Sequence, residues 1–333
     1  MRTSSIYIQN LCVPCENRCR YCLLSYNGKL LGIDYQRSEA YTKRFYDWIG
    51  ENRPDLSFGF YFGYSMEHPN LPEALAFLQS IGSPSGEFLQ FDGMKLRTPG
   101  QTKDFLLMLK NHGVKLINLT FYGTRAYHDL FAARKGDYDF MVSVLQKANE
   151  IGLPTAVDMP LSHENISQID EFFNEMDRYD TERINLFVPH SEGRGAALDD
   201  VRFSLQDYEA MGDRAKLHLN RKRFQTEGEW ITQNTFSTPE KRVLTVSLTP
   251  GNIEFFEKQS FAETIAYLER LDDAYYRTIP SLPELARLYG NPNGEKFYSE
   301  RDLYLCYQRR YIKENHIDIY DINDERQCFS RRI

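Results

Sequence analysis

The sequence lacks an excess of positive charge and any long hydrophobic run. Its 333 residues include 47 Asp and Glu against 40 Lys and Arg, which gives a formal net charge of −7. Such a chain has no general electrostatic attraction for a nucleic acid backbone. No segment approaches the roughly 18 apolar residues that a membrane-spanning helix needs, and residues 1–10 lack the apolar run of a signal peptide. We therefore expect a cytoplasmic protein that does not bind membranes and has no general affinity for nucleic acids.

A Gly-x-Gly-x-x-Gly motif is also absent after the first expected strand, which argues against a dinucleotide-binding fold. What the sequence has instead is an alternation of short apolar runs with helical patterns. Strands are expected at residues 6–11, 57–63, 88–91, 114–121, 155–159 and 184–188. Between them, residues such as Tyr41, Phe45 and Ile49 share one helical face. Six such units predict an α/β protein with a parallel sheet, and their short length favours a partial (β/α)6 TIM-type barrel over an open doubly wound sheet.

The alternation stops near residue 198. The remaining chain has charged helical patterns, one strand-like stretch at residues 242–248 and a strongly helical segment at residues 255–276. We expect a barrel domain over residues 1–200. Residues 201–333 are expected to form a smaller, mainly helical C-terminal domain that covers the substrate cleft.

Four of the six cysteines fall between residues 12 and 22. Cys15, Cys19 and Cys22 have the spacing C-x3-C-x2-C, and Cys12 precedes them. In the reducing cytoplasm, clustered thiols indicate a metal site or catalysis rather than disulfides. This segment follows the first expected strand, at the end of a barrel strand where catalytic residues are found.

Three interpretations compete for this cluster of thiols. A structural zinc site would need Cys12 as a fourth ligand, although zinc hooks are more often separated by a dozen or more residues. A ferredoxin-type electron carrier would have the spacing C-x2-C-x2-C-x3-C followed by proline, whereas Leu23 follows Cys22 here. The third interpretation is a catalytic cluster in which three thiolates leave one metal position open.

The third interpretation is supported by a resemblance. C-x3-C-x-aromatic-C after an N-terminal strand resembles the signature of the radical S-adenosylmethionine (SAM) superfamily, with Tyr21 at the aromatic position. The resemblance implies that Cys15, Cys19 and Cys22 bind three irons of a [4Fe-4S] cluster and that the fourth iron binds SAM. It also implies a one-electron reductant of the flavodoxin or ferredoxin type. Reductive cleavage of SAM would then start hydrogen abstraction from a substrate carbon.

The resemblance extends to the segment after the second strand. The family usually has Gly-Gly-Glu-Pro there, in contact with the SAM amino group. This sequence has Gly-Tyr-Ser-Met-Glu-His-Pro at residues 63–69, which keeps the residue types but adds insertions. Gly63, Ser65 and Glu67 are therefore candidate SAM contacts. The same residues also fit an ordinary turn between a strand and a helix.

Three further residues are candidate cofactor contacts by the same resemblance. Thr120 ends the fourth strand, where relatives have a hydroxyl that touches SAM. Arg134 follows a His-Asp pair and is expected to pair with the SAM carboxylate. Asp158, within the apolar fifth strand, is expected to touch the ribose or the substrate. Each residue also has an interpretation without a cofactor. Thr120 would be an ordinary β-branched strand residue, Arg134 a solvated loop charge and Asp158 a cap of a nearby backbone group.

The end of the sixth strand indicates the branch of the family. Residues 187–195 read Phe-Val-Pro-His-Ser-Glu-Gly-Arg-Gly, which resembles the molybdenum-cofactor cyclase and peptide-maturase groups. The substrate would then be a peptide or protein, or a small metabolite. Cys306 and Cys328 cannot form the multi-cysteine auxiliary domain of peptide maturases, so one cluster is expected. Cys12 is interpreted as a buried strand cysteine. No catalytic side chain is predicted.

Overall fold

The computed structural model describes residues 2–10, 15–25, 33–61, 67–237 and 241–324. Cys12, Gly63, Ser65 and Cys328 therefore lie outside the described residues. Within the described ranges, no helix combines the length and the apolar composition of a membrane-spanning segment.

Two parallel sheets form the framework. The first has the strand order β2-β1-β8, and the second has the order β3-β4-β5-β6. Their bounds are β1 Arg2–Asn10, β2 Ser57–Tyr61, β3 Phe88–Gln90, β4 Leu116–Thr120, β5 Thr155–Pro160, β6 Arg183–Phe187 and β8 Lys241–Leu248. The predicted α/β class with parallel strands is confirmed. No hydrogen-bonded ladder joins β2 to β3 in the described ranges, so the sheets are not shown to close into one continuous barrel.

Helices cover the outer side of these strands. Those in the first part of the chain are α1 Tyr35–Asn52, α2 Leu71–Ser80, α3 Pro99–Asn111, α4 Arg125–Ala132, α5 Asp137–Glu150 and α6 Ile169–Met176. Three short 3₁₀ segments accompany them: η1 Pro84–Gly86, η2 Ile166–Gln168 and η3 Gly193–Val201. The start of α3 shows how the sequence sets a boundary. Thr98 and Gln101 form a capping box there, and Pro99 occupies the first turn.

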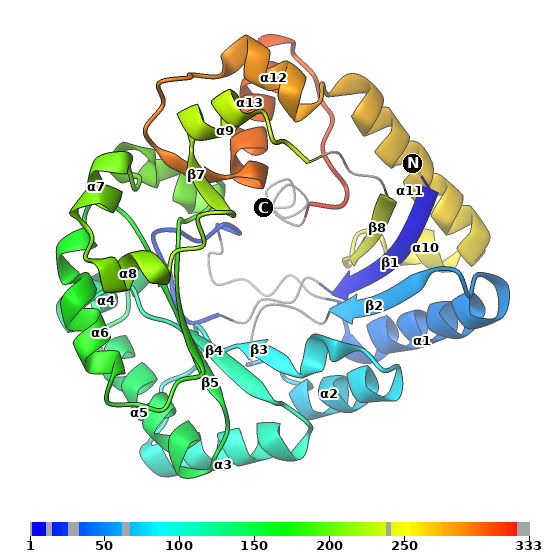
Figure 1. Ribbon diagram of the computed structural model, residues 1–333. Coiled ribbons are helices and arrows are strands. Elements are labelled where there is room, and N and C mark those ends of the chain that lie inside the picture. The colour runs from blue at the N-terminus through cyan, green and yellow to red at the C-terminus, as the bar shows by residue number, and fades with distance from the viewer. Residues whose placement is uncertain (1, 11–14, 26–32, 62–66, 238–240, 325–333) are drawn as a thin grey trace.

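The C-terminal part of the chain occupies the remaining arc of the ring seen in Figure 1, where α9, α12 and α13 lie between β7 and α11. Its helices are α7 Leu205–Ala210, α8 Asp213–Leu217, α9 Glu227–Gln233, α10 Ile253–Glu257, α11 Phe261–Thr278, α12 Leu282–Tyr289 and α13 Glu300–Glu314. The short strands β7 Phe224–Thr226 and β9 Phe297–Ser299 pair antiparallel. The described residues of this part are largely helical.

Two features of the C-terminal part differ from the sequence-based expectation. The strand-like stretch after residue 240 is β8, and it pairs in parallel with β1 along its length, so it belongs to the first sheet. The helical segment expected at residues 255–276 is two helices. Ser260 caps α11 through a capping box with Glu263, which ends the preceding helix and starts a new one. The division at residue 200 stays a prediction.

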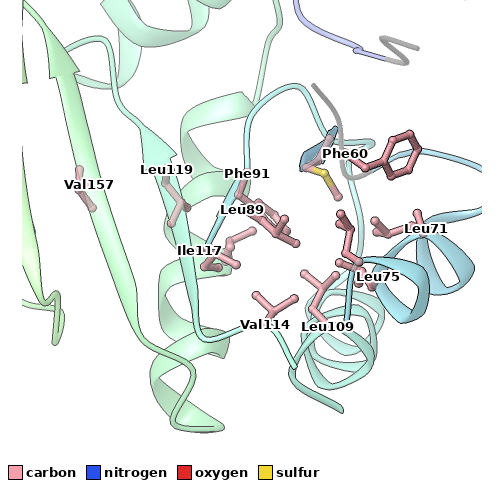
Figure 2. Close-up of a cluster of buried hydrophobic side chains, with 14 of the residues drawn as sticks. Phe60, Leu71, Leu75, Leu89, Phe91, Leu109, Val114, Ile117, Leu119 and Val157 are labelled. Carbon is pink, nitrogen blue, oxygen red and sulfur yellow. The ribbon is translucent and has the colours of Figure 1, made fainter. Parts of the chain in front are cut away.

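One large apolar core lies between the strands and the outer helices. Figure 2 shows part of it, where Phe60 of β2 and Leu71 and Leu75 of α2 lie toward Leu89 and Ile117 of the second sheet. All five side chains are buried. Burial of each such side chain contributes roughly 1.5–3 kcal/mol. This shared core joins the two sheets at the place where no ladder joins β2 to β3.

Candidate active site

The cysteine loop, which we define as residues 15–22, is fixed by backbone hydrogen bonds to two neighbouring segments. The N–H groups of Arg18 and Arg20 donate to the carbonyls of Ala132 and Phe131, at 2.9 and 3.0 Å. The N–H of Glu16 donates to the carbonyl of residue 93, at 2.8 Å. The loop therefore lies between the end of α4 and the segment after β3.

The three thiols of the loop are free and partly exposed. Burial raises the pKa of Cys15 to about 11 and also raises the pKa of Cys19. Charge on Cys22 raises both pKa values further, so the three groups are close enough to interact electrostatically. Thiolates in such surroundings need positive charge beside them, which bound iron supplies. Within the described ranges, no three His, Cys, Asp or Glu side chains converge as ligands of a single metal ion.

Aromatic side chains surround the loop on its inner side. The ring of Tyr21 lies 5.5 Å from that of Tyr122, 5.7 Å from Phe131 and 6.1 Å from Phe187, measured between ring centroids. Sγ of Cys19 lies 3.1 Å from the hydroxyl of Tyr122. Burial raises the pKa of both tyrosines, so their hydroxyls stay protonated. The predicted aromatic position therefore packs the loop onto an apolar base that limits the access of water.

Glycines let two other segments approach the loop closely. Gly93 faces Cys15, and a Cβ at residue 93 would collide with Sγ. On the other side, a Cβ at Gly193 would lie 2.6 Å from the carbonyl oxygen of Cys22. The backbone N–H of Arg194 donates to that carbonyl at 3.0 Å, and its Nε donates to the carbonyl of Cys19 at 3.0 Å. The Gly-Arg-Gly segment thus packs on the cysteine loop.

A row of polar side chains crosses the inner face of the second sheet. The amide of Asn118 donates to Gln90 at 2.8 Å and to Asp158 at 2.5 Å, and Asn185 donates to the other oxygen of Asp158 at 2.8 Å. Oδ1 of Asn118 is buried and has no hydrogen-bond partner in the part of the chain that is described. Of this row, the sequence interpretation included only Asp158. Gln90, Asn118 and Asn185 could have been found from the sequence as polar residues at alternate positions of otherwise apolar strands.

Asp92 extends this row toward the cysteine loop. It accepts hydrogen bonds from the hydroxyl and the N–H of Thr120, at 2.8 and 2.9 Å, and from Gln90 at 2.6 Å. Burial raises the pKa of Asp92 to about 7, although these hydrogen bonds oppose the rise. Asp92 lies beside the loop, because the next residue, Gly93, accepts a hydrogen bond from Glu16 and faces Cys15. The charge of Asp92 contributes to the raised pKa of Cys15 and Cys19. Sequence reasoning missed Asp92, although it lies two residues after the end of β3.

Comparison with known proteins decides the family. The family model of the radical SAM superfamily matches residues 10–176, which include the cysteine loop and the strands from β2 to β5. The chain belongs to the radical SAM superfamily. It is therefore an enzyme whose cofactors are a [4Fe-4S] cluster and SAM. A comparison with curated protein sequences gave no match.

Several solved structures are similar to the chain at low identity. SuiB from Streptococcus suis, bound to SAM, shares 11% identity over 81% of this chain, with a TM-score of 0.48. This chain spans 57% of the length of SuiB. Coproporphyrinogen III oxidase (HemN) from Escherichia coli shares 12% identity over 93% of this chain and 91% of its own, with a TM-score of 0.47. The enzyme anSMEcpe with bound SAM shares 14% identity over 94% and 93% of the two chains, with a TM-score of 0.45.

The residues present fit the radical SAM cofactors. Three uncrosslinked thiols share one loop, and the glycine beside Cys15 leaves space for its sulfur. Two buried polar atoms, Nε of Arg134 and Oδ1 of Asn118, have no protein partner in the described part of the chain. They are two of ten such buried atoms in the described residues, and they are candidate ligand contacts because their residues belong to the network at the cysteine loop and to the polar row beside it.

Arg134, the expected partner of the SAM carboxylate, is held by protein groups through its terminal nitrogens. Nη2 pairs with Asp137, and Nη1 donates to the carbonyl of Met94. Asp137 is buried, and it also binds His128 at 3.1 Å and Asn17 at 2.9 Å. This network ties the cysteine loop to α5, and Nε is the guanidinium nitrogen that is buried without a protein partner in the described part of the chain.

Glu67, the expected contact of the SAM amino group, forms an ion pair with Arg97. The two oxygens of Glu67 lie 2.5 and 3.0 Å from the guanidinium nitrogens, and one of them also accepts from the N–H of Lys95 at 2.8 Å. The other two expected residues of this segment, Gly63 and Ser65, lie outside the described residues. The role of the segment toward SAM stays a prediction.

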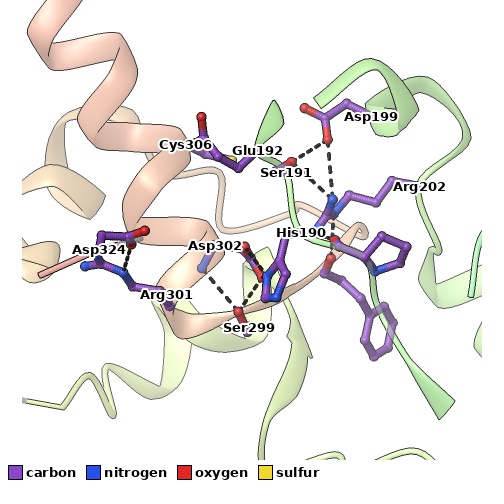
Figure 3. Close-up of polar contacts among 12 residues, drawn as sticks. His190, Ser191, Glu192, Asp199, Arg202, Ser299, Arg301, Asp302, Cys306 and Asp324 are labelled. Atoms are coloured by element: carbon purple, nitrogen blue, oxygen red, sulfur yellow. Dashed lines mark hydrogen bonds and ion pairs between the residues drawn. The ribbon is translucent and has the colours of Figure 1, made fainter. Parts of the chain in front are cut away.

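A second polar cluster lies near the C-terminal end of β6. Nδ1 of His190 is 2.9 Å from Asp302, a fully buried residue that also binds the hydroxyl of Ser299 at 2.5 Å (Figure 3). His190 lines a cavity of about 630 Å³ together with Arg301 and other residues of the C-terminal part. Cys306 is a free thiol on α13, separate from the cysteine loop in the sequence. The cluster connects the segment after β6 to α13.

Proposed function

We propose that this radical SAM enzyme holds one [4Fe-4S] cluster on Cys15, Cys19 and Cys22 and abstracts hydrogen from a carbon of its substrate. The observation that carries the proposal is the cysteine loop itself: three thiols on one loop, backed by aromatic rings, with the polar row of β3–β6 beside it. When bound, the cluster supplies the electron that cleaves SAM to methionine and the 5′-deoxyadenosyl radical. The substrate is a peptide or protein, or a small metabolite.

The finer fold assignment belongs to the same proposal. In this proposal β1 to β6 represent a partial (β/α)6 barrel, β8 extends its first sheet beside β1, and the helical remainder of residues 201–333 covers the substrate cleft. The position of α9, α12 and α13 in the arc of the ring between β7 and α11 supports this arrangement (Figure 1). The cytoplasm is the proposed location, because the cluster and free thiols need reducing surroundings.

The residues of this chain have separate tasks in the proposal. Arg134 binds the SAM carboxylate through Nε, because its two terminal nitrogens are held by Asp137 and the carbonyl of Met94. Asn118 accepts a hydrogen bond from the ligand through Oδ1 and keeps Asp158 oriented toward the ribose or the substrate.

Three other side chains prepare the site in this proposal. Thr120 acts with Asp92 as one hydrogen-bonded unit at the end of β4. Tyr21 and Tyr122 exclude water beside Cys19. The segment of Gly63, Ser65 and Glu67 holds the SAM amino group.

The experiment that tests this function uses protein purified and reconstituted without oxygen. We expect about four irons per chain, and an electron paramagnetic resonance signal of the reduced cluster that changes when SAM is added. Arg134→Gln should weaken this response to SAM. Arg125→Gln should not, because Arg125 is an exposed residue of α4 that pairs with Asp139. A reduced cluster whose signal is indifferent to SAM would indicate an electron carrier, and one bound zinc without iron would indicate a structural metal site.

A further inference from the structure

One buried carboxylate, that of Asp137, connects three parts of the candidate active site. Asp137 is the first residue of α5 and is 2% exposed. Its Oδ2 accepts a hydrogen bond from the side-chain amide of Asn17 at 2.9 Å and lies 3.1 Å from Nε2 of His128. Its Oδ1 pairs with Nη2 of Arg134. Asn17 belongs to the cysteine loop, so a single side chain joins this loop to the arginine that is expected to bind SAM.

The ring proton of His128 can be assigned from the two partners of the ring. Nδ1 accepts a hydrogen bond from the backbone N–H of Tyr122 at 3.1 Å, so Nε2 carries the proton and donates it to Asp137. His128 is fully buried, and its ring centroid lies 4.8 Å from that of Tyr122. The hydroxyl of Tyr122 lies 3.1 Å from Sγ of Cys19. Asp137 therefore also fixes, through one intervening ring, the tyrosine beside a cluster ligand.

The three donors around Asp137 require a charged carboxylate. Burial by itself would raise the pKa of Asp137, but the hydrogen bond from His128 and the charge of Arg134 lower the pKa below its ordinary value. The two oxygens of a carboxylate accept hydrogen bonds on both sides of the group, whereas an amide has an oxygen on one side and an N–H2 donor on the other. An asparagine at this position could therefore accept from Arg134 or from Asn17 and His128, but not from both sides.

The same carboxylate determines how the guanidinium group of Arg134 is presented. Nη2 is held by Asp137 and Nη1 by the carbonyl of Met94, so two of the three nitrogens are fixed. The guanidinium group is planar and rigid, so the direction of its third nitrogen is then fixed as well. This nitrogen, Nε, is buried without a protein partner in the described residues. In the proposed function it donates to the SAM carboxylate.

We propose that Asp137 is a positioning residue, which aligns Arg134 with the SAM carboxylate and holds the cysteine loop at a fixed place relative to it. This inference rests on the proposed function and adds to it a residue that does not itself contact SAM. The cluster and SAM sites then share one anchor, because Asn17 and Arg134 bind the two oxygens of one carboxylate. Such an anchor matters because a misplacement of about 1 Å can cost roughly a hundredfold in rate.

The test uses cluster-loaded protein, with SAM as the probe. Asp137→Asn keeps the size of the side chain but satisfies donors on one side only. We expect this variant to load about four irons and to bind SAM at least tenfold more weakly than the parent protein. The readout is the change that SAM causes in the electron paramagnetic resonance signal of the reduced cluster, recorded as a titration.

The matched control is Asp272→Asn. Asp272 of α11 is 1% exposed, and like Asp137 it binds an arginine and an asparagine, Arg242 and Asn323, at 2.6 and 2.7 Å. Arg242 lies at the start of β8, which pairs in parallel with β1, so this carboxylate belongs to the strand ends opposite the cysteine loop. The control carries a similar loss of buried polar contacts and should bind SAM like the parent protein.

A double-mutant cycle shows whether Asp137 acts through Arg134. Asp137→Asn combined with Arg134→Gln should weaken SAM binding by less than the two single losses multiplied together, because the group that Asp137 aligns is already absent. Single losses that multiply fully in the double variant would indicate a general structural role for Asp137. That result would overturn the proposal.

Arg134→Lys provides a second test that does not depend on the folding of Asp137→Asn. Lysine keeps the positive charge, but its ammonium group pairs with Asp137 as a point charge and presents no second donor in a fixed direction. It should therefore lose SAM affinity like Arg134→Gln, and it decides the question if Asp137→Asn does not load its cluster. Parental affinity in Arg134→Lys, or in cluster-loaded Asp137→Asn, would overturn this inference and leave the proposed function standing. A parent cluster that does not respond to SAM would contradict both.

Discussion

Gly93 leaves the space in which the thiol of Cys15 lies: a Cβ at residue 93 would collide with Sγ. The two residues come from different strand ends, since Cys15 follows β1 and Gly93 follows β3. The backbone of Gly93 has a φ of +65°, which favours glycine over any residue with a side chain. A position outside the cysteine motif therefore controls the geometry of a cluster ligand.

Gly93→Ala should reduce or abolish iron loading, because the added methyl group displaces the thiol of Cys15. Iron content and the visible absorption of reconstituted protein measure the effect. The matched control is Gly82→Ala, since Gly82 has a φ of +64° and open space at the Cβ position. Both variants carry similar backbone strain of about 1 kcal/mol. Equal iron content in the two variants would show that the contact with Cys15 has no consequence.

The assignment of Cys15, Cys19 and Cys22 as cluster ligands predicts which cysteines the cluster requires. Cys15→Ala, Cys19→Ala and Cys22→Ala should each lose the [4Fe-4S] cluster, because a site with three thiolates has none to spare. Cys306→Ala should keep it, because Cys306 lies on α13, outside the cysteine loop. Cys12→Ala and Cys328→Ala are also expected to keep it. Loss of the cluster in Cys12→Ala would instead favour coordination by four cysteines and no open iron.

Thr120→Val should weaken SAM binding while the cluster stays intact. Valine keeps the β-branched shape of β4 but removes the hydroxyl that donates to Asp92. In the proposal the hydroxyl also contacts a polar group of SAM. Leaving that group unpaired costs roughly 1–3 kcal/mol, which corresponds to about five- to a hundred-fold in the Kd for SAM. Thr155→Val is the control, because Thr155 begins β5 at the opposite strand end and donates to the carbonyl of Asp180 at 3.3 Å. An unchanged Kd for SAM in Thr120→Val would remove this residue from the binding site.

His68 and Asp92 should make opposite contributions to the stability of the cluster-free protein as the pH is lowered from about 7.5 to 5.5. The raised pKa of Asp92 lets the folded chain take up a proton, which is stabilising, whereas His68 is destabilising. Burial lowers the pKa of His68 from 6.5 to about 4, so between these values the unfolded chain binds a proton that the folded chain excludes. Linkage then predicts a loss of about 1 kcal/mol from this residue over that range. Urea unfolding of the parent and of His68→Phe at both pH values measures it. On lowering the pH, the free energy of unfolding of the variant should change by about 1 kcal/mol in the favourable direction relative to the parent. An identical change in the two proteins would contradict the burial argument.

The strands of the two sheets could be predicted from the sequence, because parallel strands buried on both faces form short apolar runs. The position of β8 beside β1 could not, since periodicity does not specify which strands pair. The predicted helix at residues 255–276 is divided at Ser260, because the capping box with Glu263 outweighs the continuous apolar pattern.

The cysteine ligands of the candidate site could be predicted from the sequence, because their spacing along the chain alone brings them together. The partners of the other site residues could not be predicted, because they depend on contacts between segments that are distant in the sequence. Arg134 was identified from its neighbours in the sequence, but its pairing with Asp137 and its contact with Met94 depend on the packing of the loop after α4. Asp92 and Asn118 gain their positions only when the strands assemble.

The most direct test of the central claim is the formation of 5′-deoxyadenosine. Cluster-loaded protein, SAM and dithionite are incubated without oxygen, and the products are measured by chromatography and mass spectrometry. We predict 5′-deoxyadenosine and methionine, formed slowly without substrate by the parent protein and absent with Cys19→Ala. Cluster-loaded, reduced protein that binds SAM yet forms no 5′-deoxyadenosine, either alone or with candidate peptides and metabolites, would contradict the account.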